Sequence, residues 1–142
     1  MVSVAQRVVE TWRTTGISLN AGASRTDLED LSALLQLDVP ADICEFYGLA
    51  NGMPDLVYDD HQVRFWSISK IREEHQHGTW GDAEIGFADF LINSWRFIFR
   101  VVDNQVIVVS ENVRLGDPME SLGSFSDFLE IYLTDSMRLC IL

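Results

Sequence analysis

The sequence predicts an α+β domain with a central, mostly antiparallel sheet flanked by N-terminal helices and a C-terminal helix. Apolar residues recur at helical spacing in the first third of the chain. β-favouring segments separated by turn residues fill the middle, and a capped helical pattern returns near the end. Helices first, strands next and a helix last are typical of α+β architecture. At 142 residues we expect one domain, residues 1–142.

The first two helices are predicted from their apolar spacing and from their ends. The first spans about residues 2–15, before Gly16, with an apolar face at Val2, Ala5, Val8, Val9 and Trp12. Thr26 and Glu29 form a capping-box pattern that predicts the start of the second helix. Its buried stripe is expected at Leu28, Leu31, Leu34 and Leu35.

The third helix is the best-defined element of the sequence. Pro40 suits its first turn, where a missing N–H costs nothing. Asn51-Gly52 is expected to end it, because both residues tolerate the left-handed conformation. The apolar face is Ile43, Phe46, Tyr47 and Ala50. Cys44 lies beside that face and is predicted to be a small core residue.

The middle of the chain is predicted to change to strands. Val57-Tyr58 and residues 63–66 flank Asp59-Asp60-His61, a plausible hairpin. After it we expect, in order, a short helix at 68–75, a loop at 77–83 and a strand at 85–90.

A second hairpin is clearer, because side chains alternate along residues 95–102 and Asp103-Asn104 is a turn dipeptide. Residues 105–110 return as a strand, and Gly116-Asp117-Pro118 breaks the chain. Ser124 and Asp127 then repeat the capping pattern. The apolar face of that last helix is Phe125, Phe128, Leu129, Tyr132 and Leu133.

Charge excludes some functions. Ten Lys and Arg residues against 22 Asp and Glu give a net charge of -12. Such a surface repels phosphate backbones and anionic headgroups, so we expect no nucleic-acid or membrane partner, and a basic protein partner is favoured. The sequence has no secretory pattern and no long apolar run. These features predict a cytoplasmic protein in which Cys44 and Cys140 stay reduced.

The sequence contains no nucleotide-binding, nucleophile-elbow, zincin or EF-hand motif. The nearest approach to a metal cluster is Glu74, His75 and His77 with Asp82 and Glu84 downstream. A solvated polar segment is the better interpretation, because the histidine spacing is not specific. We therefore predict no catalytic residue, no metal and no cofactor.

Adjacent acids and one tryptophan are the remaining candidates. Asp59-Asp60 and Glu73-Glu74 could suggest general acid–base catalysis, but neighbouring carboxylates in a turn share one environment, water. They are expected to be solvated. Trp80 lies between glycines in a predicted loop and has no periodic partner, which favours an interface residue.

Three segments taken in order resemble the SUKH superfamily (Smi/Knr type), whose members include bacterial immunity proteins and regulators of cell-wall synthesis. Residues 39–52, VPADICEFYGLANG, look like the family's Pro-initiated helix ending in Asn-Gly. Residues 65–71, FWSISKI, are similar to its strand leading into a short helix. Residues 124–129, SFSDFL, resemble its closing helix.

The resemblance implies an α+β fold and a binding function without catalytic residues. It favours an immunity protein that neutralises a cognate bacterial toxin, and an acidic surface would suit a basic toxin such as a nuclease. The residues expected to contact that partner are Asp55, Asp59, Asp60, Glu73, Glu74 and Trp80. The alternatives are a regulatory protein-interaction domain and a small metal-binding enzyme built on His75 and His77.

Overall fold

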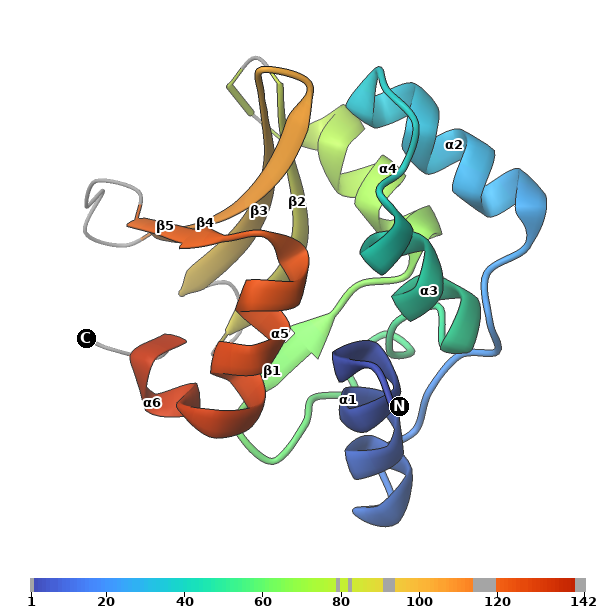
Figure 1. Ribbon diagram of the computed structural model, residues 1–142, viewed down its shortest axis with the longest axis vertical. Helices are drawn as coiled ribbons and strands as arrows, with labels where there is room; N and C mark the ends of the chain where they lie inside the picture. Colours follow the sequence, from blue (N-terminus) through green and yellow to red (C-terminus); the bar gives the residue numbers. More distant parts are fainter. Residues whose placement is uncertain (1, 79, 82, 91–93, 114–119, 140–142) are drawn as a thin grey trace.

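The computed structural model confirms the α+β fold: one antiparallel sheet with helices packed against it (Figure 1). It describes residues 2–78, 80–81, 83–90, 94–113 and 120–139. The predicted break at 116–118, Asp82 and Cys140 lie outside the described residues. The helices are α1 (Val4–Thr14), α2 (Arg25–Leu35), α3 (Ala41–Leu49), α4 (Ile68–His77), α5 (Phe125–Thr134) and α6 (Ser136–Leu139). The strands are β1 (Val63–Phe65), β2 (Glu84–Phe90), β3 (Trp95–Val102), β4 (Gln105–Asn112) and β5 (Glu120–Gly123).

Three helices begin with the same reciprocal cap. The Ser3, Ser24 and Ser124 hydroxyls each accept a hydrogen bond from the backbone N–H three residues later, and that residue's side chain accepts from the cap's own N–H. The prediction that Thr26 caps α2 is wrong. Ser24 pairs with Asp27 instead, because Ser-x-x-Asp starting two residues earlier closes the same box.

The Asn51-Gly52 pair joins three segments rather than forming the cap of α3. The helix ends at Leu49, Ala50 is extended, and only Gly52 of the pair has a positive φ, 68°. The Asn51 side chain accepts from the first N–H of α4, at Ile68 (2.9 Å). A Cβ on Gly52 would lie 2.5 Å from the Trp66 carbonyl, so the close approach of these segments requires glycine here.

The five strands pair in chain order, β1-β2-β3-β4-β5, and every pair is antiparallel. The predicted turn Asp103-Asn104 joins β3 to β4 with both residues at positive φ, as expected. The predicted hairpin at 57–66 is wrong in one arm. β1 pairs with β2, whereas Val57-Tyr58 forms no strand, because Val57 closes a turn onto Pro54 and Leu56 is left-handed. Helix α4 runs on to His77, two residues beyond the predicted end.

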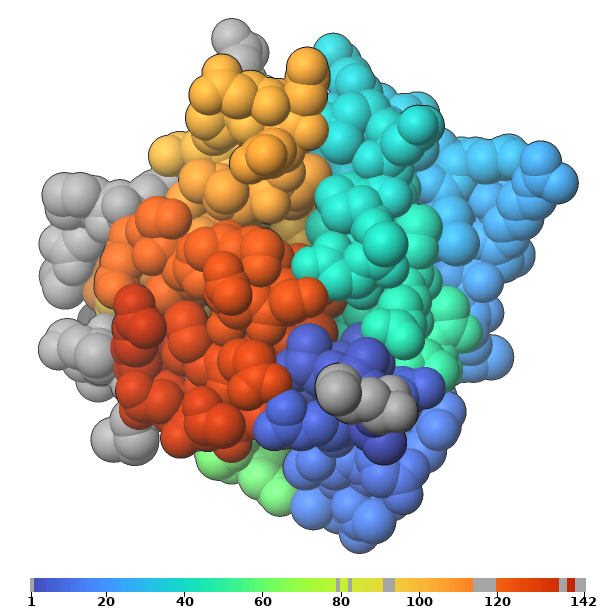
Figure 2. Space-filling model, viewed as in Figure 1, coloured from blue at the N-terminus to red at the C-terminus, as the bar shows by residue number. Residues whose placement is uncertain are grey.

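One face of the sheet and the inner faces of the helices form the core. Phe46 of α3 is central to it, with ring contacts to Trp12, Tyr47, Phe65 and Phe125. In the space-filling view α1, α3 and α5 lie against one another over this core (Figure 2).

The other face of the sheet carries a row of charges across four strands. Arg64, Asp89, Arg96 and Glu111 occupy successive register positions from β1 to β4. Arg64 and Asp89 form an ion pair at 2.8 Å, and Arg96 and Glu111 form another at 3.0 Å. Ile98 and Val109 in the next row are also buried, so this face of the sheet is covered at its centre as well.

Candidate functional site

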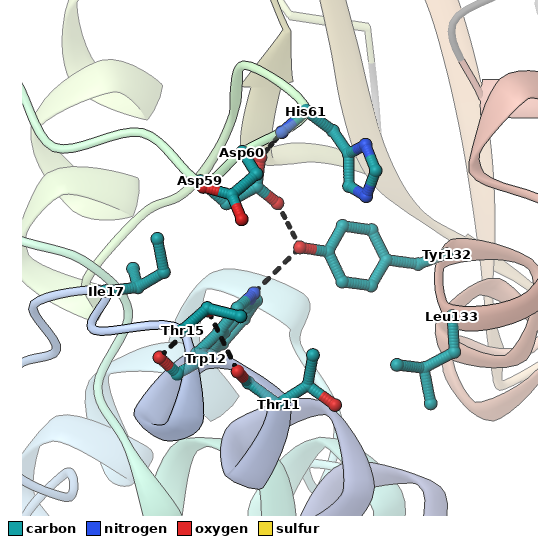
Figure 3. Close-up of a pocket in the computed structure, with 9 residues that line it drawn as sticks. All are labelled: Thr11, Trp12, Thr15, Ile17, Asp59, Asp60, His61, Tyr132 and Leu133. Atoms are coloured by element: carbon teal, nitrogen blue, oxygen red, sulfur yellow. Dashed lines mark hydrogen bonds between the residues drawn. The ribbon is translucent and has the colours of Figure 1, made fainter.

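A small cavity of about 80 Å³ lies between α1, α5 and the segment that precedes β1 (Figure 3). Helix α1 contributes Thr11 and Trp12 to its wall, and α5 contributes Tyr132 and Leu133. The cavity brings together one of the acid pairs that the sequence singled out, Asp59-Asp60, and His61.

Asp59 is buried, so the prediction that it shares a watery environment with Asp60 is wrong. Its side chain is 4% exposed. One carboxylate oxygen, Oδ1, accepts hydrogen bonds from the backbone N–H groups of His61 (2.8 Å) and Val63 (2.9 Å). The carboxylate therefore serves as the acceptor for these two N–H groups in the tight turn that leads into β1. To reach them, the Asp59 side chain must point into the protein. Asp59 therefore has almost no exposed surface to offer a partner.

Tyr132 links Asp59 to the first helix. Its hydroxyl donates to Asp59 Oδ2 and accepts from the Trp12 indole N–H at 2.7 Å (Figure 3). Burial, and then the neighbouring Asp59 charge, raise the pKa of the Tyr132 hydroxyl well above its usual range. The phenol therefore keeps its proton at neutral pH and serves as a fixed donor.

The chemistry open to this cavity follows from these bonds. Asp59 already accepts three hydrogen bonds and Tyr132 holds its proton, so neither is free to act as a base. His61 is exposed, and its ring packs edge-on against Tyr132 with centroids 6.2 Å apart. The arrangement holds the segment before β1 against α1 and α5, and leaves exposed Asp60 at the rim.

The other predicted contact residues do not form one patch with Asp60. Asp55 is exposed in the same segment, and Glu73 is exposed on α4. Glu74 is half-buried and forms an ion pair with Lys70 at 3.0 Å, which neutralises its charge. Asp60 precedes β1, which pairs with the end of β2, whereas α4 leads to the beginning of β2. The candidates thus lie toward opposite ends of that strand (Figure 1).

Trp80 is half-buried against the sheet rather than projecting from a loop. Its indole N–H donates to the Glu74 carbonyl at 3.0 Å, and the Arg96 guanidinium lies 4.3 Å from its ring centroid. A Cβ on Gly86 would lie 2.5 Å from the ring, so a glycine in β2 provides the space for it. The residue is therefore held in place while part of it remains accessible.

The histidines and the cysteine also have defined positions. His75 is half-buried on α4, with its Nδ1 buried and unpaired, whereas His77 is exposed. In the part of the chain that the structure describes, no three His, Cys, Asp or Glu side chains lie close enough to hold a metal ion. Cys44 is only partly buried, so its prediction as a core residue is wrong; that burial raises the pKa of its thiol.

Sequence reasoning missed the pairings on which these positions depend. Tyr132 and Trp12 were placed correctly on apolar helix faces, yet their hydrogen bond spans 120 residues. The buried partners Arg64 and Asp89 were not singled out either. Helical and strand periodicity predicts which face of an element is buried, but not which residues distant in the sequence pack against that face.

Comparison with known proteins adds no family. No protein-family model matches the chain, and no curated protein matches it. The resemblance to the SUKH superfamily remains a prediction. None of the helices in the described ranges is both long and apolar enough to cross a membrane.

Proposed function

We propose that this chain is a non-enzymatic protein-binding domain that acts in the cytoplasm as an immunity protein, neutralising a cognate bacterial toxin. The partner that suits it is a basic toxin domain, for example a nuclease. The family resemblance suggests the biological role, and the charge distribution supports the kind of partner.

The observation that carries the proposal is how the cations are used. The structure describes nine of the ten Lys and Arg residues, and eight of these nine form ion pairs with carboxylates of the same chain. The ninth, Arg13, donates to the Leu49 carbonyl. The exposed acids outside these pairs, among them Asp38, Asp55, Asp60 and Asp103, therefore face solvent without a cation from the described chain. Such a surface attracts a basic partner over a range of about 10 Å at 0.1 M salt.

The candidate contact set is smaller than the sequence predicted. Asp59 is buried and Glu74 is paired, which leaves Asp55, Asp60 and Glu73 as exposed acids, with Trp80 beside the sheet. Asp55 and Asp60 share one segment, so they form the smallest unit that can be tested together.

The test uses the product of the reading frame next to this chain's gene, where the family resemblance places the toxin. Co-expression of the two should protect cells, and the purified proteins should bind with an association rate that falls as salt rises. The variant Asp55→Lys with Asp60→Lys should slow association. The control, Glu10→Lys with Glu45→Lys, changes the charge equally at exposed positions on α1 and α3 and should slow it less.

The outcomes separate the parts of the proposal. If the wild-type chain binds the neighbouring gene product but does not protect cells from it, the immunity role is rejected in favour of a regulatory interaction domain. Equal effects of the two charge-reversed variants would reject the segment before β1 as the contact. Turnover of any substrate by the purified chain would contradict the non-enzymatic assignment.

A further inference from the structure

A second, larger cavity opens where the helices meet the start of the sheet. It measures about 630 Å³ and lies between the end of α2, the end of α4, the beginning of β2 and the β3–β4 hairpin. Its apolar wall is formed by Leu34, Leu35, Ile85 and Val101. We call this cavity the hairpin groove. Its volume falls within the range of about 300–1,000 Å³ that is typical of binding pockets.

The polar groups of the groove are held in place by the fold. The Glu84 side chain, 11% exposed, pairs with Arg100 at 2.5 Å and accepts the Gly81 N–H at 3.1 Å. Trp80, fixed by its own hydrogen bond, forms part of the wall. The groove is therefore already formed and needs no rearrangement before a ligand enters.

One lining residue has a buried polar atom without a hydrogen-bond partner in the described chain. His75 lines the groove, and its Nδ1 is buried without a hydrogen-bond partner. Buried polar atoms normally have partners, so an unpaired one beside a cavity marks a position that the chain has not itself satisfied.

Two exposed acids stand on segments that border the groove. Asp38 follows the lining residue Leu37, and Asp103 precedes the lining residue Asn104. Both are exposed, and within the described residues neither forms an ion pair. Glu84, the acid among the lining residues, is paired with Arg100.

We propose that the hairpin groove binds a basic segment of a protein partner, with one apolar side chain entering between the Leu34 and Val101 walls. Cationic residues on either side of it pair with Asp38 and Asp103. This inference rests on the proposed function and names a contact surface for it, one that includes Trp80 but none of the acids predicted from the sequence. The negative charge of Asp38 and Asp103 selects a basic segment over an acidic one.

The probe is a short synthetic peptide, acetyl-Lys-Gly-Leu-Gly-Lys-amide, titrated into the isotopically labelled full chain. Two control peptides replace both lysines by glutamates or the leucine by glycine. Binding of the first peptide should shift the Trp80 indole N–H and the amides of Val101 and Asn104, and both control peptides should bind more weakly.

A matched pair of variants tests the charges. Asp38→Asn with Asp103→Asn should lower the affinity for the basic peptide about three- to tenfold, the range expected for losing two exposed charge pairs. Both positions are exposed, and asparagine tolerates the positive φ of 51° at Asp103, so the variant should fold normally. Glu10→Gln with Glu45→Gln removes the same charge from exposed positions on α1 and α3, outside the groove, and should leave the affinity for the peptide unchanged.

Three results would overturn the inference: no binding by the basic peptide at millimolar concentration, equal binding by the acidic peptide, or equal weakening by the two variants. The peptide assay contains no toxin, so its failure leaves the protection assay unaffected. Failure of protection with a positive peptide result would reject the immunity role and leave the groove standing.

Discussion

The Tyr132 hydroxyl joins α5 both to α1 and to the segment before β1. It accepts from the Trp12 indole and donates to Asp59, and all three side chains are buried. Removing it would leave a buried N–H without an acceptor and a buried carboxylate with one donor fewer. Leaving a buried polar group without a partner lowers the free energy of unfolding by more than the net contribution of the hydrogen bond itself. Removing this one hydroxyl should therefore have a large effect on stability.

Tyr132→Phe should lower the free energy of unfolding by about 1–3 kcal/mol, measured by urea denaturation at neutral pH. The variant should also differ from the wild type in how much stability it loses at alkaline pH. The folded-state pKa of Tyr132 is raised, so the unfolded chain ionises first, and stability falls as pH rises above about 10, the usual value.

The phenylalanine variant should lose less stability over that alkaline range than the wild type. The buried Tyr47, whose pKa is also raised, is present in both proteins and cancels in the comparison. Identical alkaline loss in the two proteins would contradict the burial of the Tyr132 hydroxyl.

Asp89 is the fully buried carboxylate of the charged row, and it accepts from Arg64 at 2.8 Å and from the Trp66 indole at 3.2 Å. Asp89→Asn should cost about 3–5 kcal/mol, because it leaves the Arg64 charge buried and unpaired. Asp55→Asn, at an exposed site, is the control and should leave the urea midpoint unchanged.

The pH dependence of the Asp89 variant has a defined sign. Burial raises the Asp89 pKa above its ordinary 3.8, more than Arg64 lowers it. Wild-type stability therefore falls as pH rises from 3.8 to the raised value, whereas asparagine does not titrate. The stability difference between the two proteins should shrink across that window, and a difference that widens would be evidence against the raised pKa.

Among the elements, α2 allows the cleanest test of a helix cap. Ser24→Ala should destabilise the protein by about 1 kcal/mol, the usual cost of losing such a cap. Thr26→Ala, two residues into the helix, makes no cap bond in the structure and should have little effect on the thermal midpoint. The reverse ranking would show that the helix begins where the sequence first indicated.

Helix α3 is the element whose loss should matter most to the core. Phe46→Ala should destabilise the protein by about 3–5 kcal/mol, because it removes a fully buried ring that contacts aromatic residues from α1, β1 and α5. A change in the urea unfolding free energy of under about 1 kcal/mol would show that this face of α3 is not core.

What the sequence could predict follows from how far apart the interacting residues are. The position of α3, the Asp103-Asn104 turn and the start of α5 depend on residues within a few positions of one another, and all three were predicted. The N-cap of α2 was missed because two cap patterns, one starting at Ser24 and one at Thr26, overlap within six residues. The apparent strand at 57–58 was wrong because β-favouring side chains there had no strand beside them with which to pair.

The candidate site was less predictable for the same reason. Asp59 looked solvated beside Asp60, and only the distant Tyr132 and the turn into β1 give its carboxylate a reason to be buried. The hairpin groove brings together residues from α2, α4, β2, β3 and the loops beside them, and Leu34 and Asn104 are 70 positions apart in the chain. Trp80 was recognised by its lack of a periodic partner, but its neighbours were not.

At the scale of the whole molecule, net charge governs how copies of the chain meet. The net charge of -12 keeps molecules apart at neutral pH, and the sequence pI is near 4.4. Solubility should therefore pass through a minimum near pH 4.4, because repulsion is lost as net charge approaches zero. Turbidity measured from pH 3 to pH 8 checks this, and a flat profile between pH 4 and pH 5 would contradict it.

The order of the strands has a consequence for aggregation. A sheet that follows chain order has two edge strands, and here they are β1, three residues long, and β5, four residues long. The long strands β2, β3 and β4 are enclosed between them. The Val63 and Phe65 carbonyls of β1 already accept hydrogen bonds from the Asp59 and Met53 N–H groups, and β5 is short, so neither edge offers a long template for adding another strand to form a fibre. A partner must therefore recognise this protein by its side chains rather than by extending its sheet.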